Sequence, residues 1–276
     1  MKLLLVFVEG EHDVVWTERS LRVHRNYVEF KRPVQNFPTP LGGTGERGVL
    51  ARQLVHATDQ RLTTAKRPPL PRLEAALHHQ KDDTLALVMQ MHGLAQLDPV
   101  VAFLGNLFML LSASKYEITA CAVAMLLDAD NEGVAEREAG LSRKLASVYP
   151  GLAALSHGAW QQHALGPVGV WVFHDPGTGM GSLEHCLEPV VSEALAVFWA
   201  AAASFLAGIP RDPLVALPVD RDAAARFKAT LTAAGQVVKP GAAMHGMLSH
   251  DVLLGDALKA SADSKALAEF LAAPRW

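Results

Sequence analysis

The sequence predicts an α/β protein whose sheet is mainly parallel. Four short apolar runs, each bounded by polar residues or glycine, have the length and the Val, Leu and Ala content of strands that are buried on both faces. They are Leu3 to Val8, Thr84 to Met91, Cys121 to Leu127 and Val168 to Phe173. Segments with helical spacing follow these runs, and this alternation is typical of a doubly wound sheet with helices on both faces. We therefore expect about four to five strands in such a sheet.

The totals of the sequence fit a globular protein with a large core. The chain has 276 residues, of which 50% are hydrophobic, and a formal net charge of -3. Its two cysteines, Cys121 and Cys186, lie in apolar or helical patterns, which argues against a disulfide framework and favours a reducing compartment. The longest apolar stretch, Ala194 to Ile209, is shorter than the roughly 20 residues that a membrane helix needs. We expect a cytoplasmic protein that does not span a membrane.

The first predicted strand leads into a helix. Leu3 to Val8 ends at Glu9-Gly10-Glu11, and the apolar spacing that follows is helical as far as Val23. Residues 25 to 80 then interrupt the α/β rhythm with six prolines and a glycine-rich stretch from Gly42 to Gly48. We expect this Pro/Gly-rich segment to be an insertion in the sheet or a cap on it, with a helix from Val49 to about Leu62. Its glycine-rich stretch lacks the Gly-Lys-Ser/Thr ending of a P-loop, which argues against phosphate binding by that loop.

The inserted segment is also basic. Arg25 to Lys81 contains ten Lys or Arg residues and four acids, whereas the remainder of the chain has 15 basic and 24 acidic residues. A basic segment on an acidic body suits an anionic partner such as a nucleic-acid backbone. Arg47 and Arg52, near the glycine-rich stretch, are the candidate phosphate contacts. A solvated insertion without such a partner is the alternative.

The second half of the α/β pattern repeats strand and helix. A helix is predicted from Pro99 to about Ser112, and another after Gly133. From Ser182 onward the chain is predicted to be helical, apart from a short strand candidate at Leu214 to Val219. We therefore expect an α/β domain over residues 1–190, with its insertion at about 25–80, and a helical C-terminal region over residues 191–276 that packs on it.

One helix of the C-terminal region is apolar on nearly every side. It covers residues 194–209, where Leu195, Phe198 and Trp199 begin one helical face and alanines fill the other. A helix that is apolar all round is buried, either in its own core or against another chain. The sequence leaves both possibilities open.

Acidic residues follow three of the predicted strands. Glu9 comes after the first, Asp128, Asp130 and Glu132 stand at alternate positions after the third, and Asp175 follows the fourth. The carboxyl ends of parallel strands meet at one edge of a sheet, where open α/β folds bind their ligands. Carboxylates gathered there favour a hard divalent cation, Mg²⁺ or Mn²⁺. A solvated acidic turn is the alternative.

Two of these motifs together resemble the Toprim domain, a metal-binding module of topoisomerases, bacterial-type primases and OLD-like nucleases. They are strand-Glu9-Gly10 and strand-Asp128-x-Asp130-x-Glu132-Gly133. The stretch from Gly169 to Asp175, followed by Gly179 to Glu184, is similar to small stand-alone Toprim proteins. The resemblance covers residues 1–24 and about 84–190. It implies that Glu9, Asp128 and Asp130 hold Mg²⁺, and that Glu132 is the third acid found in some members.

Such a carboxylate site suits phosphoryl chemistry. With two ions roughly 3.5–4 Å apart, one activates a water and the other stabilises the leaving oxygen. Glu9, Asp128 and Asp130 would hold the first ion, and Glu132 or Asp175 would complete a second site. Alternatively, Glu9 would act as general base or acid, because crowded like charges raise the pKa of a carboxyl group.

The sequence lacks the parts that other Toprim activities need. Its tyrosines, Tyr27, Tyr116 and Tyr149, do not lie in a topoisomerase gate domain, and two cysteines cannot form the zinc module of a primase. We therefore expect a divalent-metal-dependent nuclease that acts on DNA or RNA. Two alternatives stay open, namely a nucleotidyl transferase and a non-catalytic regulatory subunit that binds metal or nucleotide and serves a partner ATPase. The apolar helix over 194–209 favours such a partner or a homo-oligomer.

Overall fold

A seven-stranded mixed sheet is the centre of the fold in the computed structural model, which describes residues 1–42, 50, 71–93, 96–113, 116–208, 219–238, 240–241, 246, 248 and 251–276. The strand order is β2-β3-β4-β1-β5-β7-β6. The strands are β1 (Lys2–Val8), β2 (Val28–Glu29), β3 (Arg72–His79), β4 (Thr84–Gln90), β5 (Ala120–Asp128), β6 (Ala159–Gln161) and β7 (Val168–Phe173). The helices are α1 (Glu11–Arg25), the short 3-10 helix η1 (Val34–Asn36), α3 (Leu97–Ala113), α4 (Val134–Leu145), α5 (Leu183–Ala194), α6 (Ala196–Ala207), α7 (Val219–Val238), α9 (Asp251–Ala260) and α10 (Ala262–Ala272).

The four strands that the apolar runs predict form the parallel centre of this sheet. β1 pairs in parallel with β4 on one side and with β5 on the other, and β5 pairs in parallel with β7. The bounds of all four differ from the predicted ones by no more than one residue at each end. The mainly parallel α/β sheet is therefore confirmed.

In the described residues the sheet has seven strands, more than the four to five that we expected, because antiparallel strands extend both of its edges. β3 and β2 come from the segment that we expected to be an insertion or a cap, and β3 pairs antiparallel with β4. At the other edge, β6 pairs antiparallel with β7. A register shift between Leu73 and Ala75 interrupts the two-residue alternation of β3. Such a bulge hides a strand from a search for alternating apolar residues.

Two other predicted elements fall largely outside the described residues. Of the helix predicted for Val49 to about Leu62, the structure describes Leu50, which is helical. Of the strand predicted for Leu214 to Val219, it describes Val219, which begins α7. Both remain predictions, except that Val219 is helical rather than extended.

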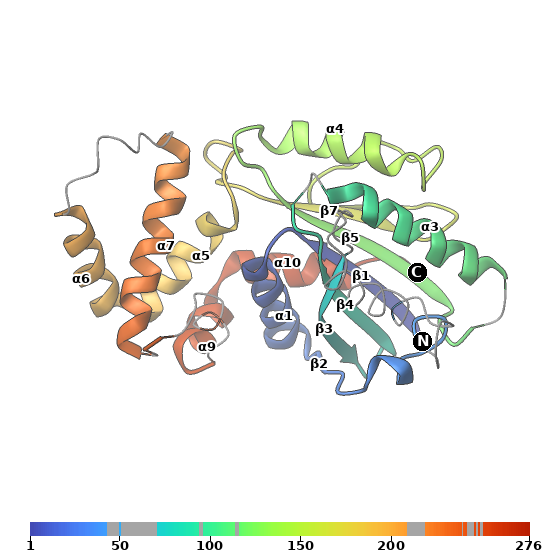
Figure 1. The fold of residues 1–276 in the computed structure, drawn as a ribbon, viewed down its shortest axis with the longest axis horizontal. Helices are drawn as coiled ribbons and strands as arrows, with labels where there is room; N and C mark the ends of the chain where they lie inside the picture. The colour runs from blue at the N-terminus through green and yellow to red at the C-terminus, as the bar shows by residue number, and fades with distance from the viewer. Residues whose placement is uncertain are drawn as a thin grey trace, which may run out of the picture.

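Alternate residues of β1 point into two separate cores. Leu3, Leu5 and Phe7 pack with residues of α3 and α4, whereas Leu4, Val6 and Val8 pack with residues of α1, α5 and α10. Figure 1 shows α3 and α4 over one face of the sheet and α1 and α10 over the other. Because side chains alternate between the faces and both faces are covered, the strand sequence is apolar throughout.

The C-terminal helices lie in two places. Figure 1 shows α5, α6, α7 and α9 beyond the carboxyl ends of the parallel strands, whereas α10 lies along the sheet beside α1. Ser264 of α10 shares a buried 2.8 Å hydrogen bond with Ser20 of α1. The indole of Trp160 in β6 donates to the carbonyl of Phe270 at 2.8 Å, and the two rings stack. In its packing, the last helix therefore belongs to the α/β body.

The apolar helix predicted over residues 194–209 is interrupted at its start. α5 ends at Ala194, α6 begins at Ala196, and the two helices are bent by 117°. On α6 Ala202 is buried, but Val197 is 79% and Phe205 66% exposed. Within the described residues, part of the apolar surface of α6 therefore remains exposed.

Within the described residues, no single helix has both the length and the hydropathy needed to cross a membrane. α5 and α6 meet the two criteria only when they are taken together as a bent pair.

Gly169 of β7 lies close to Trp160 of β6 and to Phe270 of α10. A Cβ at Gly169 would lie 2.8 Å from Cδ2 of Trp160 and 2.9 Å from Cζ of Phe270. We expect Gly169→Ala to lower the free energy of unfolding by about 1–3 kcal/mol, the usual cost of overpacking. The matched control is Gly105, which is exposed in α3 with no atom near its Cβ position. There, Gly105→Ala should raise stability by about 0.5–1 kcal/mol. Urea unfolding measures both changes, and equal effects of the two substitutions would contradict the packing of α10 on β7.

Candidate metal centre

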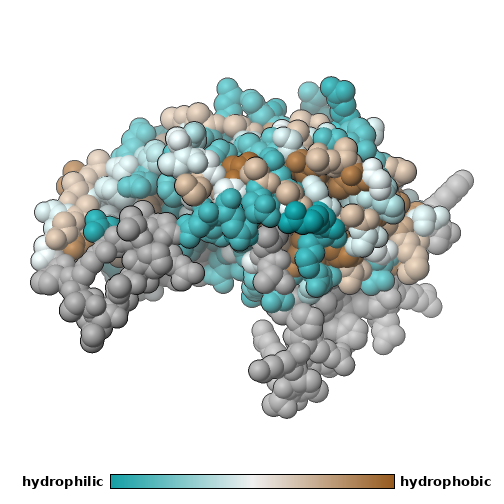
Figure 2. Space-filling model, turned by 90° about the horizontal axis from the view of Figure 1, so that it is seen from above, coloured by the Kyte–Doolittle hydropathy of each residue, from teal (hydrophilic) through white to brown (hydrophobic). Residues whose placement is uncertain are grey.

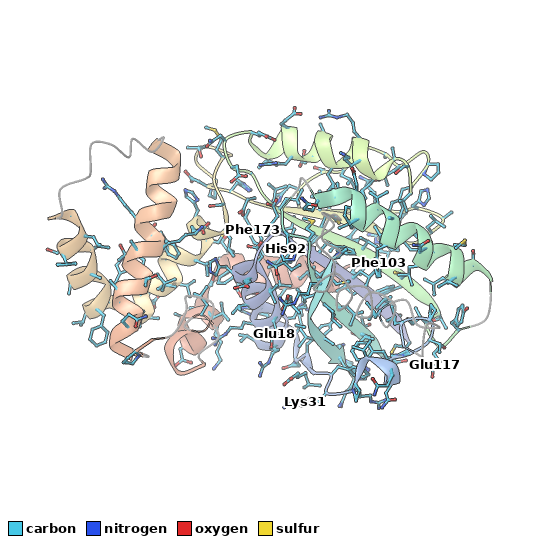
Figure 3. The ribbon with its side chains drawn as sticks, viewed as in Figure 1. Glu18, Lys31, His92, Phe103, Glu117 and Phe173 are labelled. Carbon is cyan, nitrogen blue, oxygen red and sulfur yellow. The ribbon has the colours of Figure 1, made fainter. Side chains whose placement is uncertain are left out.

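The carboxyl ends of β1 and β5 bring Glu9 and Asp128 together. Glu9 directly follows β1, Asp128 is the last residue of β5, and the backbone N–H of Asp128 donates to Oε1 of Glu9 at 3.3 Å. Figure 3 shows His92 and Phe173, at the carboxyl ends of β4 and β7, on the side that faces α5. Glu117, which precedes β5, lies at the opposite end. One edge of the sheet therefore gathers all the carboxyl ends of the parallel strands.

Two acids to which the sequence analysis gave no role join this edge. Asp13, in the first turn of α1, is 5% exposed and accepts the backbone N–H of Gly10 at 2.8 Å. Glu184, in the first turn of α5, is 8% exposed. Oδ1 of Asp128 accepts the N–H of Leu183 from the same turn at 2.9 Å. A sequence pattern could have identified both acids. Each lies in the first turn of a helix that follows a parallel strand, and such helices begin at the carboxyl edge of the sheet.

Burial raises the pKa of three of these carboxyl groups. Burial, and then the charges of neighbouring acids, raise the pKa of Glu9 from 4.5 to about 7. Burial and the charge of Glu9 likewise raise the pKa of Asp13 to about 7. The pKa of Asp128 rises well above its usual range through burial and through the charges of Asp13 and Glu9. A positive charge among them would favour the ionised form of all three groups.

The pKa of Glu184 is lowered instead, because a lysine of the protein pairs with it. Burial acts to raise its pKa, but the contacts with Lys228 and Ser182 outweigh burial and lower the pKa overall. Nζ of Lys228 lies 2.8 Å from Oε1 of Glu184, and the Ser182 hydroxyl donates to Oε2 at 2.6 Å. Lys228 belongs to α7, so a helix from the C-terminal region contributes a charge to this edge of the sheet.

Asp130 and Glu132 turn toward a different partner. β5 ends at Asp128, and Asp130 adopts a left-handed conformation with φ 49°. Nη2 of Arg137, in α4, donates to Oδ2 of Asp130 at 2.6 Å, and its Nη1 lies 3.4 Å from Oε2 of Glu132. The three alternating acids are therefore not side chains of one extended strand. An arginine that the sequence analysis gave no role pairs with two of them.

The remaining predicted site residues are placed differently. Oδ1 of Asp175 accepts the N–H of Gly177 at 2.9 Å, and Oδ2 accepts the Thr178 hydroxyl at 3.2 Å. These bonds, the Gly177 bond first, lower the pKa of Asp175. Both oxygens of Asp175 are thus used in its own turn. Arg47 and Arg52 lie outside the described residues, and their contacts with phosphate remain a prediction.

The acids have the chemistry of a hard-cation site, but their present rotamers do not form one. Among the described residues, no three His, Cys, Asp or Glu side chains converge closely enough to hold an ion. However, Glu9, Asp13 and Asp128 supply buried carboxylate oxygens, the ligands that Mg²⁺ and Mn²⁺ prefer. Burial raises the pKa values of these three acids, and among the described residues no basic side chain forms an ion pair with them. By its chemistry, the donor set fits such an ion.

Comparisons with known proteins show a similarity of fold. No family model matches the chain, and no curated protein matches it. Among solved structures, the chain is similar to a hypothetical protein from Pyrococcus horikoshii OT3, with 13% sequence identity and a TM-score of 0.57. The match covers 99% of this chain and 100% of the other. At this identity, the likeness shows a shared fold alone.

The raised pKa of Glu9 should make the stability of the metal-free protein depend on pH. Burial keeps this carboxyl group protonated in the native state up to its raised pKa of about 7, whereas the pKa of an unperturbed Glu is 4.5. The native state therefore holds more protons between these values. The contribution of Glu9 to the free energy of unfolding should be greatest below pH 4.5 and should fall up to about pH 7, by about 1.4 kcal/mol per pH unit.

Urea unfolding with a chelator present, from pH 4 to pH 8, tests this dependence. Glu9→Gln should flatten the fall, while Asp256→Asn, which alters a fully exposed carboxyl group in α9, should leave it unchanged. If Glu9→Gln shows the same pH dependence as the wild type, Glu9 is not buried as described.

Proposed function

We propose that this chain is a divalent-metal-dependent nuclease that hydrolyses phosphodiester bonds in DNA or RNA. One observation carries this proposal, namely that Glu9, Asp13 and Asp128 share a buried edge of a parallel sheet and have raised pKa values. Buried like charges are tolerated when they are protonated or when a cation binds among them. A Toprim-like domain, which the strand-Glu9 and strand-Asp128-x-Asp130 motifs resemble, would use carboxylates at this edge for that purpose.

Glu9, Asp128 and Asp130 would hold Mg²⁺ or Mn²⁺, with Asp13 as a further carboxylate. Asp130 would contribute its Oδ1, since its Oδ2 contacts Arg137. When bound, the ion would supply charge stabilisation at the phosphoryl oxygens and lower the pKa of its water. The protein already orients two of these groups, since the N–H of Gly10 donates to Asp13 and that of Leu183 donates to Asp128. Hydrogen bonds of this kind fix the orientation of metal-binding carboxylates.

Lys228 is suited to binding the phosphate group of a substrate. Its side chain is 47% exposed, so an anion from solvent can reach it, while the buried Glu184 holds its ammonium group at 2.8 Å. A charge-assisted contact of an ammonium group with phosphate positions the backbone without selecting a base sequence. Such a contact fits a nuclease whose substrate is either DNA or RNA.

The second candidate is a non-catalytic subunit that binds metal or nucleotide and regulates a partner ATPase. The exposed apolar side chains of α6 favour it, since Val197 is 79%, Phe198 41% and Phe205 66% exposed. In Figure 2, tan and brown residues appear at the left end of the molecule, where α6 lies. Contiguous apolar surface is typical of protein interfaces.

Cleavage of nucleic acid by the purified chain tests the first proposal. With Mg²⁺ or Mn²⁺, we expect the wild type to cut supercoiled plasmid DNA or tRNA, and EDTA to stop the reaction. Asp128→Asn should lower the rate by at least about 100-fold, because loss even of an outer partner of a metal ligand can cost that much. Asp256→Asn, the same change at a fully exposed position, should keep the wild-type rate.

The other outcomes separate the candidates. If neither substrate is cut with either metal while the chain binds a nucleotide or an ATPase tightly, the regulatory function replaces the nuclease. If the products are longer than the substrate, the reaction is nucleotidyl transfer.

A further inference from the structure

We propose that Arg137 is a built-in cation that takes the place of a second metal ion, so that this site binds a single divalent ion. The inference rests on the proposed metal-dependent function. It adds the number of ions and the residue that replaces the second one.

The guanidinium group of Arg137 reaches two acids at once. Nη2 lies 2.6 Å from Oδ2 of Asp130, and Nη1 lies 3.4 Å from Oε2 of Glu132. The Arg137 side chain is only 10% exposed, whereas the side chains of the two acids are 54% and 56% exposed. Arg137 is therefore held in a mostly buried position on α4. Its planar guanidinium group contacts both carboxylates and supplies one positive charge to the pair.

Only some of the acids at this edge of the sheet have a basic partner. Three acids pair with a cation of the protein, namely Asp130 and Glu132 with Arg137, and Glu184 with Lys228. Among the described residues, three others form no ion pair, and these are Glu9, Asp13 and Asp128. One divalent ion would offset most of their negative charge.

A second divalent ion would have to compete with Arg137. The sequence analysis offered Glu132 or Asp175 for that ion. Glu132 contacts Arg137, and both oxygens of Asp175 are used in its own turn. A guanidinium group does not lose its proton in proteins, so it cannot yield its carboxylates by becoming neutral. The positive charge of Arg137 would also repel a second divalent ion bound nearby.

The charge of Arg137 also acts beyond its two ion pairs. The arginine also lies close enough to Glu9 for its charge to favour the ionised form of that acid. Arg137 is thus placed to stabilise charge that develops on a phosphate bound beside the single ion.

The number of Mn²⁺ ions bound by the full chain tests the inference. It is measured by electron paramagnetic resonance of free Mn²⁺ at neutral pH, without any substrate. We expect one ion per chain for the wild type and for Arg137→Lys, which keeps the charge. Arg137→Gln should gain a second, weaker ion. The control is Arg143→Gln, which removes an exposed arginine of the same helix that pairs with Glu136 at 3.0 Å, and it should bind one ion.

Two ions in the wild type would overturn the inference, and so would a single ion in a folded Arg137→Gln. If thermal melting shows that Arg137→Gln does not fold, Glu132→Gln decides. In that variant, our inference requires a single ion whose affinity changes less than about twofold. An affinity loss of about tenfold or more, as expected for a lost ligand or its partner, would overturn it.

The same measurement keeps this inference apart from the proposed function. A wild type that binds no Mn²⁺ overturns both, whereas two bound ions overturn only the inference. If the wild type binds one ion, Arg137→Gln binds two, and neither cuts DNA or RNA, the inference stands and the nuclease proposal fails.

Discussion

The parallel pairing of β1 with both β4 and β5 is the constraint on which the rest of the structure depends. β1 is hydrogen-bonded on both edges, and its side chains from Leu3 to Val8 are fully buried on both faces. Since its neighbours run in the same direction, every strand of the parallel centre ends at one edge. The helices that return from that edge, α1 and α5, must begin there. The direction of the strands therefore brings Glu9, Asp13, Asp128 and Glu184 together from distant parts of the sequence.

Placing several acids at a buried edge of the sheet is electrostatically unfavourable, and the fold supplies basic partners for only some of them. Lys228 pairs with Glu184 and Arg137 with Asp130, whereas among the described residues Glu9, Asp13 and Asp128 have raised pKa values and no ion-pair partner. A site optimised for stability alone would pair these groups or replace them. A charge imbalance kept in a buried position is typical of sites that bind a cation or move a proton.

The segments outside the parallel centre are joined to it more closely than their composition suggests. β3 extends the sheet beside β4, although it follows a segment rich in proline. α10 closes the face beside α1 through the Ser20 to Ser264 hydrogen bond, and α7 supplies Lys228 to the acidic edge. The C-terminal helices therefore contribute both to the core and to the charge of the candidate site. α6 differs, since much of its apolar surface stays exposed.

The sequence by itself determined the four parallel strands and the meeting of Glu9 with Asp128, because short continuous apolar runs bounded by polar residues or glycine are typical of strands buried on both faces. It could not place Asp130, whose left-handed backbone turns it away from the alternation expected of a strand. It also could not reveal Arg137 or Lys228 as partners of these acids, since both pairs depend on how helices pack against strand ends. The sequence also did not predict the break at Leu195 or the bulge in β3. Local patterns encode burial, whereas the charge balance of the site was decided only by tertiary contacts.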